Sequence, residues 1–218
     1  MERKHHNIDH LSEEWFEIRK RRFTSSKASD LLANGRAKDS IGLSFYSYIY
    51  ETVENELLGD DPDAFSGSAD TERGNELEPI AFNAFREQMA LDFISVTKCG
   101  FFTLGDHEGS SPDGLVGDDA VLEIKAPRRR KFFEIVRVGI DAVDKGWKEQ
   151  VQHQMRVTGR NRAYLVFIFV DDAGRIFLHD IEVARDEGIQ AKFESRLPIA
   201  IKEKEEYKQY LIEKYEIN

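Results

Sequence analysis

Ser111-Pro112-Asp113-Gly114-Leu115, followed closely by Leu122-Glu123-Ile124-Lys125-Ala126-Pro127, is the stretch of this sequence that decides the fold. Between the two lies Gly117-Asp118-Asp119, a run of residues that favour a turn, centred near Asp118. The flanking segments 113–116 and 120–126 are therefore predicted to be two strands joined as a β-hairpin. An acidic residue of the first strand then lies beside an acidic residue and a lysine of the second.

The charged side chains of this hairpin are predicted to gather in one patch. Successive side chains of a strand point to opposite faces, so Glu123 and Lys125 project together. Leu122 and Ile124 point the other way, into the core. The turn would set Asp113 opposite Glu123, and directly opposed residues have Cβ atoms about 5 Å apart.

Two carboxylates and a lysine at this spacing suit phosphodiester hydrolysis. Like charges so close are unfavourable unless a cation lies between them, and Mg²⁺ prefers one or two carboxylates with waters. A lysine beside the cation can orient or deprotonate a water and offset negative charge on the phosphate. The alternative is a surface hairpin with an ordinary pair of neighbouring Glu and Lys residues.

The rest of the chain predicts one α/β (α+β) domain over residues 1–218, with a central mixed sheet flanked by helices. Residues 1–12 are expected to be flexible and 185–218 to form a helical extension. Pro79 is tolerated only near the start of a helix, so its helix is expected to begin close to Leu77. Helices are expected at 13–18, 26–33, 45–57, 76–89, 144–157 and 185–215, a loop at 59–69, and strands at 93–104, 113–116, 120–126, 164–170 and 175–183.

Composition excludes several classes of protein. The chain of 218 residues is 40% hydrophobic and 33% charged, which is typical of a globular protein. No apolar run approaches the roughly 20 residues that cross a bilayer, and the polar N-terminus does not resemble a signal peptide. The single cysteine, Cys99, excludes an internal disulfide framework and a cysteine metal cluster. We therefore expect a cytoplasmic location, the host cytoplasm if a phage encodes the chain.

The charge is segregated along the chain. The net charge is −10, which argues against bulk attraction to nucleic acid. Two runs of four consecutive cations, 19–22 and 128–131, nevertheless offer local basic tracks, whereas 51–78 holds ten carboxylates and one base, Arg73. Each basic run has the alternative of being only a solvated stretch of the surface.

Four motifs, in order, resemble those of a known family. The Ser-Pro-Asp-Gly and Leu-Glu-Ile-Lys segments resemble the PD-(D/E)xK signature of restriction-endonuclease-like nucleases, and specifically the bacteriophage lambda exonuclease (YqaJ-like viral recombinase) family. Trp15-Phe16-Glu17-Ile18-Arg19 with Thr24-Ser25-Ser26 is similar to its Trp-x-x-x-Arg…Thr-x-Ser segment. Gly74-Asn75-Glu76-Leu77-Glu78 resembles its Gly-x-x-x-Glu motif, and Gln150-Val151-Gln152 its Gln-x-Gln motif. The resemblance spans about residues 15–170.

The resemblance implies a role for each matching residue. Asp113, Glu123 and the main-chain carbonyl of Ile124 would hold a divalent metal, Mg²⁺ or else Mn²⁺, and Lys125 would be the catalytic lysine. Glu78 would hold a second ion, and Gln152 would position the nucleophile or a ligand. The terminal 5′-phosphate would be received by Arg19, Ser26 and Thr24, and Trp15 would contact substrate near the DNA entrance. Apart from the resemblance, Arg128 and Arg129 directly follow the strand that carries Lys125, so we expect them to contact phosphates of the substrate.

Several of these residues also have purely structural interpretations. Glu78 could be an acid favoured by the helix dipole, and Gln152 a solvent-facing helix residue. Arg19 and Ser26 could be a salt-bridge partner and a helix cap, and Trp15 could belong to the core. We expect the N-terminal histidines His5, His6 and His10 to lie in a flexible tail. His107 has no spacing to other residues that would make it a metal ligand.

The resemblance implies 5′-to-3′ degradation of one strand of linear duplex DNA to 5′-mononucleotides, leaving a 3′-ended strand for recombination. It also implies a trimeric ring and cooperation with a phage-type single-strand annealing protein. Two alternatives remain open: another endonuclease or nickase of the superfamily, and a non-catalytic DNA-binding protein with the same fold.

Overall fold

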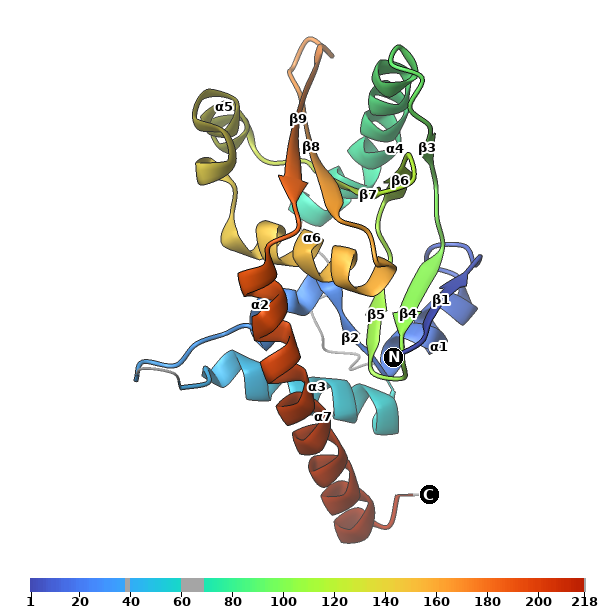
Figure 1. Ribbon diagram of the computed structural model, residues 1–218, viewed down its shortest axis with the longest axis vertical. Helices are drawn as coiled ribbons and strands as arrows, with labels where there is room; N and C mark the ends of the chain where they lie inside the picture. The colour runs from blue at the N-terminus through green and yellow to red at the C-terminus, as the bar shows by residue number, and fades with distance from the viewer. Residues whose placement is uncertain (38–39, 60–68, 218) are drawn as a thin grey trace.

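A five-stranded mixed sheet carries the predicted hairpin. The computed structural model describes residues 1–37, 40–59 and 69–217 (Figure 1). The strand order is β3-β6-β7-β8-β9, antiparallel except for the parallel pair β7 and β8. The strands are β3 (Val96–Thr97), β6 (Gly114–Val116), β7 (Ala120–Lys125), β8 (Arg162–Val170) and β9 (Ile176–Ala184). The expected mixed sheet is confirmed.

The register of the hairpin agrees with the sequence. Gly114 pairs with Leu122, and Val116 pairs with Ala120, so the turn is centred on Asp118. One step further out, the backbone N–H of Asp113 donates to the carbonyl of Leu122 at 3.0 Å. Asp113 therefore enters the hairpin directly opposite Glu123, as alternation along the strands requires.

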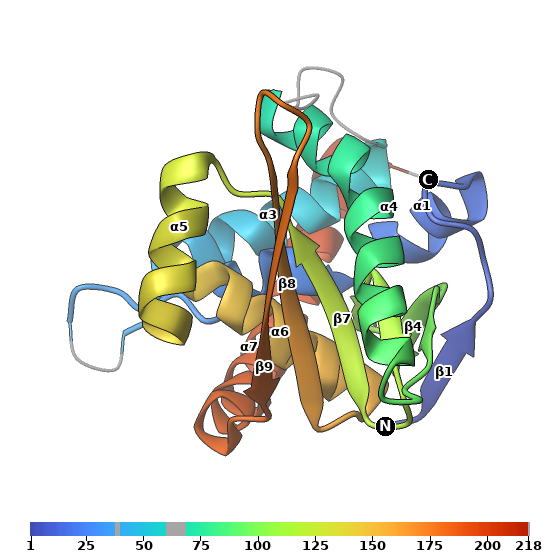
Figure 2. The same ribbon diagram turned by 90° about the horizontal axis from the view of Figure 1, so that it is seen from above.

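Helices cover both faces of this sheet. Figure 2 shows α4 (Ala69–Ala90) on one side of the strands and α5 (Arg129–Val138) on the other. Phe82 and Phe85 of α4 pack on Leu122 and Ile124. The opposite face is covered by α5 and by α6 (Lys145–Thr158), whose buried side chains include Phe132, Ile135, Val151 and Met155.

A second, four-stranded sheet lies beside the first, in the order β1-β4-β5-β2. Its strands are β1 (Arg3–His6), β2 (Phe23–Thr24), β4 (Phe101–Leu104) and β5 (Glu108–Ser110). All four residues of β1 pair antiparallel with β4, so the flexible tail expected over residues 1–12 is corrected there: backbone pairing fixes this segment, including His5 and His6. The α1 helix (Glu13–Lys20) follows, capped by Ser12, whose side chain accepts from Trp15 N–H.

A third group of helices encloses its own core. It comprises α2 (Ala28–Leu31), α3 (Leu43–Leu58) and α7 (Glu187–Tyr215), joined through buried residues such as Phe45, Ile49 and Phe193. The helical extension expected from residue 185 agrees with α7, whose far end reaches beyond the rest of the molecule (Figure 1). Short 3-10 turns, Ser25–Lys27 and Gly139–Ala142, precede α2 and α6.

Two helices differ from expectation. The α4 helix begins at Ala69, so Pro79 lies inside it rather than near its start. Proline lacks an N–H and leaves the carbonyl of Asn75 without its usual helical donor, a cost that the burial of Phe82 and Phe85 offsets. The α5 helix was not expected, because its first residues form the basic run 128–131. The loop expected at 59–69 lies, over 60–68, outside the described residues.

Among the described residues, no helix is both long and apolar enough to span a membrane.

Candidate active site

The two hairpin carboxylates converge, as predicted. Asp113 Oδ2 accepts a hydrogen bond from the backbone N–H of Ile124 at 2.6 Å. Glu123, on β7, is buried. Burial raises the pKa of Asp113 well above its usual value, and the negative charges of Glu123 and Glu78 raise it further, against the Ile124 hydrogen bond and the charge of Lys125. The site therefore concentrates negative charge that a cation would relieve.

Lys125 bridges Glu123 to the α6 helix. Its Nζ donates to Glu123 Oε1 at 2.6 Å and to Gln150 Oε1 at 3.0 Å. Burial alone would lower the pKa of Lys125, but the charge of Glu123, the hydrogen bond to it, and the charges of Asp113 and Glu78 together raise the pKa. Lys125 is therefore held as an ammonium, which is a donor and a positive charge rather than a base.

The glutamines of α6 divide between two faces, which corrects the placement expected for Gln152. Gln150 Nε2 donates to Glu123 Oε1 at 2.6 Å, and Gln154 Nε2 donates to Glu123 Oε2 at 2.5 Å. Gln152 instead donates to the carbonyl of Ala184 at 2.8 Å and accepts from Asp186 N–H at 2.8 Å.

Helix geometry explains this division. Residues four apart lie on one face of a helix, whereas residues two apart lie about 200° apart around it. Gln150 and Gln154 therefore face the sheet, and Gln152 faces the start of α7. The spacing of four puts Gln154 on the same helix face as Gln150, but only the packing of α6 on the sheet shows that this face meets Glu123.

A cleft between α4 and β7 brings Glu78 to the carboxylates. Its volume is about 620 Å³, and Glu78, Asp113, Glu123, Lys125 and Arg128 are among the residues that line it. Glu78 lies beside Pro79 in α4 and accepts from Lys98 Nζ at 2.7 Å. Lys98 was not singled out in the sequence, because nothing in its neighbourhood relates it to a residue 20 positions earlier.

The donor set of this cleft fits a hard divalent cation. Within residues 1–37, 40–59 and 69–217, no three His, Cys, Asp or Glu side chains are already arranged as a metal site. Magnesium does not require three, since it is commonly held by one or two carboxylates and retains several waters. Asp113 and Glu123, with the carbonyl of Ile124 between them in the chain, provide oxygen ligands of this kind, and Glu78 lines the same cleft.

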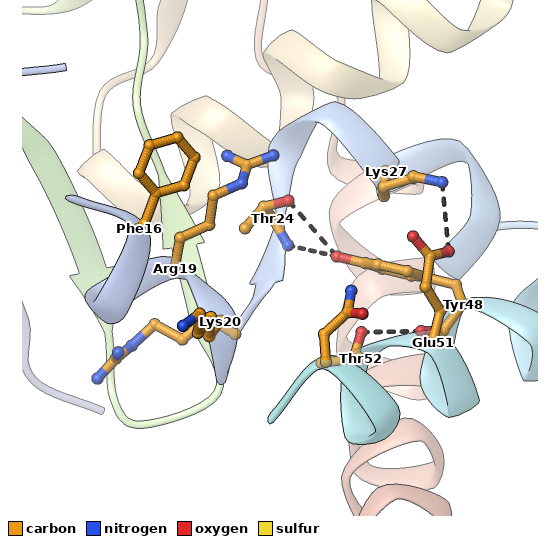
Figure 3. Close-up of a pocket in the computed structure, with 10 residues that line it drawn as sticks. Phe16, Arg19, Lys20, Thr24, Lys27, Tyr48, Glu51 and Thr52 are labelled. Atoms are coloured by element: carbon orange, nitrogen blue, oxygen red, sulfur yellow. Dashed lines mark hydrogen bonds and ion pairs between the residues drawn. The ribbon is translucent and has the colours of Figure 1, made fainter. Parts of the chain in front are cut away.

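A second, cationic pocket lies between α1 and α3. Figure 3 shows Arg19 and Thr24 on one side of it and Lys27 and Tyr48 on the other. Arg19 Nη2 donates to Ser26 Oγ at 2.8 Å, and Ser26 Oγ lies 3.3 Å from Thr24 Oγ1. The structure thus brings together the three residues that the sequence assigned to a terminal phosphate.

Arg19 is available to bind an anion. No carboxylate of the described residues forms an ion pair with it, and burial lowers its pKa from its ordinary high value. Its guanidinium lies over the ring of Trp15, 4.8 Å from the centroid. Tyr48, which sequence reasoning missed, fixes this loop, because its hydroxyl accepts from the backbone N–H of Thr24 at 2.7 Å.

Trp15 connects the cationic pocket to the segment that leads into the β6–β7 hairpin. It is buried, and its Nε1 donates to Ser111 Oγ at 3.2 Å, two residues before Asp113. Trp15 lines neither the cleft nor the cationic pocket. Its contacts are therefore those of a packing residue, whose ring lies against the guanidinium of Arg19. The sequence allowed either role.

The basic run after β7 begins at the edge of the cleft. Arg128 lines the cleft and donates to Asp70 Oδ1 at 2.9 Å. Arg129 and Arg130 lie on the exposed side of α5 and line a separate surface groove with Phe133 and Arg137. The run therefore leads from the carboxylates along the surface of the protein.

Comparison with known proteins identifies the family of this chain. Residues 14–161 match the YqaJ-like viral recombinase domain. No curated protein matches the chain. The chain is similar to the crystal structure of an alkaline exonuclease, LHK-Exo, from Laribacter hongkongensis, at 30% identity and a TM-score of 0.74, covering 94% of this chain and 98% of that one.

Two further structures extend the comparison. LHK-Exo in complex with dAMP is 29% identical with a TM-score of 0.75, over 94% of this chain and 98% of that one. A phage-related exonuclease from Haemophilus somnus shares the fold, with 17% identity and a TM-score of 0.68, over 87% of this chain and 96% of that one. The chain therefore belongs to the YqaJ-like viral recombinase family and has the fold of phage-type exonucleases.

Proposed function

We propose that this protein degrades one strand of linear duplex DNA from its 5′ end, releasing 5′-mononucleotides and leaving a 3′-ended single strand for recombination. The observation that carries the proposal is the cleft where Asp113, Glu123 and Lys125 meet, together with a second pocket lined by Arg19, which forms no ion pair with a carboxylate of the described residues. The first arrangement suits hydrolysis of a phosphodiester, and the second suits recognition of a terminal phosphate.

The hydrolytic step would be carried out in the cleft. Mg²⁺, or Mn²⁺, held by Asp113, Glu123 and the Ile124 carbonyl, with a second ion near Glu78, would supply an activated water and neutralise phosphoryl oxygens. Lys125, held as an ammonium, would donate to the phosphate as negative charge develops on it. Gln150 and Gln154 would keep the carboxylate of Glu123 oriented.

The cationic pocket would give the enzyme its direction. A guanidinium matches two oxygens of a phosphate at once, and Ser26 is exposed beside Arg19, where its hydroxyl can donate to a third. If the cationic pocket binds the 5′-phosphate while the cleft holds the scissile bond, the number of nucleotides between that phosphate and that bond is fixed. The capture of dAMP by LHK-Exo supports a mononucleotide as the unit released.

The assembly and the partners are also part of the proposal. Family membership supports a trimeric ring around duplex DNA and cooperation with a phage-type single-strand annealing protein. Arg128 and Arg129, which lead away from the cleft, would contact the DNA backbone.

One assay tests the function. Linear duplex labelled at one end is incubated with Mg²⁺, with Mn²⁺ or with chelator, with and without a 5′-phosphate, alongside covalently closed circles. We expect labelled mononucleotides only with metal and linear DNA, and faster release from phosphorylated ends. Cutting of closed circles would instead identify an endonuclease or nickase, and binding without any cleavage would identify a non-catalytic protein of the same fold.

Arg19→Ala is expected to remove the preference for 5′-phosphorylated ends. Losing a charged hydrogen bond to phosphate costs about 1.5–3 kcal/mol, which corresponds to roughly 10- to 100-fold in kcat/KM on phosphorylated duplex. Rates on 5′-hydroxyl ends should change little. Arg21→Ala, which removes an exposed cation two residues away, serves as the control; an unchanged preference in Arg19→Ala would place the phosphate pocket elsewhere.

The glutamines of α6 are expected to separate catalysis from stability. Gln150→Ala should lower turnover by roughly 10- to 100-fold, because it removes a donor to the carboxylate of Glu123. Gln152→Ala should leave turnover within a few fold and lower the unfolding temperature, since it deprives Ala184 and Asp186 of partners. Turnover and thermal unfolding measured on both variants check this; the reverse pattern would restore Gln152 to the site.

A further inference from the structure

A chain of buried polar side chains connects the 3-10 turn Ser25–Lys27, β5 and α6 on the inner side of the phosphate pocket. Ser25 Oγ donates to Ser110 Oγ at 2.8 Å and lies 2.9 Å from His153 Nδ1. His153 Nε2 lies 3.4 Å from Glu108 Oε2. Glu108 in turn accepts from Arg156 Nε at 2.7 Å and from Arg156 Nη2 at 3.3 Å.

Three members of this chain are next to residues of the proposed function in the sequence. Ser25 lies between Thr24 and Ser26 of the phosphate pocket. Ser110 is three residues before Asp113, in the strand that leads into the catalytic hairpin. His153 precedes Gln154, which donates to Glu123. The pocket and the carboxylates come from separate elements, and the hydrogen bonds of this chain join the backbone segments that carry them.

Burial excludes these side chains from contact with substrate. Ser110 and His153 are 0% exposed, Glu108 is 2%, Ser25 is 4% and Arg156 is 6%. Either atom of the contact between Ser25 Oγ and His153 Nδ1 can be the donor, according to the tautomer of the imidazole.

The charged end of the chain anchors it. Burial would raise the pKa of Glu108, but its hydrogen bonds and charge interactions with His153 and Arg156 lower the pKa, so the carboxylate stays ionised. A buried ion pair of this kind is costly to disturb, because a partner that is removed leaves an uncompensated charge. Glu108 and Arg156 therefore hold α6 against β5 at a fixed distance.

We infer that Ser25, Ser110 and His153 are positioning residues that set the distance between the terminal-phosphate pocket and the Asp113–Glu123 cleft. This inference rests on the proposed function. The chain fixes Ser25 relative to both Ser110 and α6, and through Ser25 it fixes the hydroxyls of Thr24 and Ser26 that flank it. The distance between the pocket and the cleft determines how many nucleotides lie between the bound 5′-phosphate and the bond that is cut. At the distance that these residues set, that number is one.

Ser25→Ala and Ser110→Ala test the inference, with Thr103→Val as a matched control. Thr103, on β4, is 3% exposed and its hydroxyl lies 3.1 Å from His6 Nε2, so the control also removes a buried hydroxyl, but outside the chain. The first measurement is the affinity for 5′-phosphorylated against 5′-hydroxyl duplex in chelator, which needs no metal. The second is the length of the products released with Mg²⁺.

We expect each serine variant to lower the phosphate-to-hydroxyl affinity ratio by about 10-fold, because misplacing a binding group by 1 Å can cost up to 100-fold. Products longer than one nucleotide should accompany the mononucleotides. Thr103→Val should lose thermal stability comparably while keeping the wild-type ratio and product length.

Serine variants that fold and keep both the wild-type ratio and mononucleotide products would overturn the inference, leaving the chain a support for the core alone. If one serine variant does not fold, the same two measurements on the other serine variant and on His153→Gln test the inference. A wild-type protein without preference for 5′-phosphate would refute the proposed function as well, so the two failures are distinguished by the wild type.

Discussion

Lys125→Ala is expected to abolish degradation of duplex DNA while sparing binding to DNA in chelator. The ammonium of Lys125 is the cation that the chain itself places beside Glu123, 2.6 Å from its carboxylate. Without it, negative charge that develops on the phosphate in the transition state loses a preorganised donor in a buried site. Removing one preorganised donor to developing negative charge costs about 100- to 1,000-fold, so single-turnover cleavage of end-labelled duplex should fall by up to about 1,000-fold.

The control for this variant is Lys202→Ala. Lys202 is on α7, with its side chain 74% exposed, and its ion pair with Glu206, itself 60% exposed, is of the surface kind that contributes little. Both variants should bind duplex in chelator with wild-type affinity. Near-wild-type turnover by Lys125→Ala would remove this residue from the mechanism.

Asp113→Asn is expected to abolish cleavage and, at the same time, to raise the unfolding temperature of the metal-free protein. Burial and the charges of Glu123 and Glu78 already raise the pKa of Asp113, which means that its ionised form destabilises the fold. An amide has the same shape, keeps an oxygen to accept from Ile124 N–H, and carries no charge. For a domain of this size, each kcal/mol of relieved repulsion raises the unfolding temperature by about 2–4 °C.

The metal dependence of stability completes this test. Mg²⁺ should raise the unfolding temperature of the wild type, because a ligand that binds only the folded state stabilises it, and should do so much less for Asp113→Asn. Asp118→Asn, an exposed position at the tip of the same hairpin, should behave as the wild type. A metal-free Asp113→Asn protein that is less stable than the wild type would mean that the carboxylate is structural rather than a ligand held under repulsion.

Local pattern was sufficient wherever neighbours in the chain are neighbours in space. The hairpin register, with Gly114 opposite Leu122, follows from alternation and from the turn residues between the strands. The start of α1 at Ser12 follows from the capping preference of serine. In each case the interacting groups are separated by few residues, so the sequence contains both partners of the interaction.

Pattern failed where packing outweighed local preference. Pro79 predicts a helix that begins close to it, yet α4 begins at Ala69, ten residues before Pro79. The two glutamines of the Gln-x-Gln motif look equivalent in the sequence, but helix rotation sends Gln150 to Glu123 and Gln152 to Ala184. Only the location of the sheet relative to α6 decides which of the two faces the carboxylate.

The sequence by itself determined the mixed α/β fold and the pairing of Asp113 with Glu123 and Lys125, because strand alternation and a short turn place those groups within one hairpin. The tertiary structure alone decided that Glu78 of α4 reaches the same cleft, that Gln154 joins Gln150 at Glu123, and that Ser25, Ser110 and His153 form one buried chain. These groups are separated by tens of residues, and no local preference encodes a distance between them; it arises when the two sheets and α6 pack around a common core.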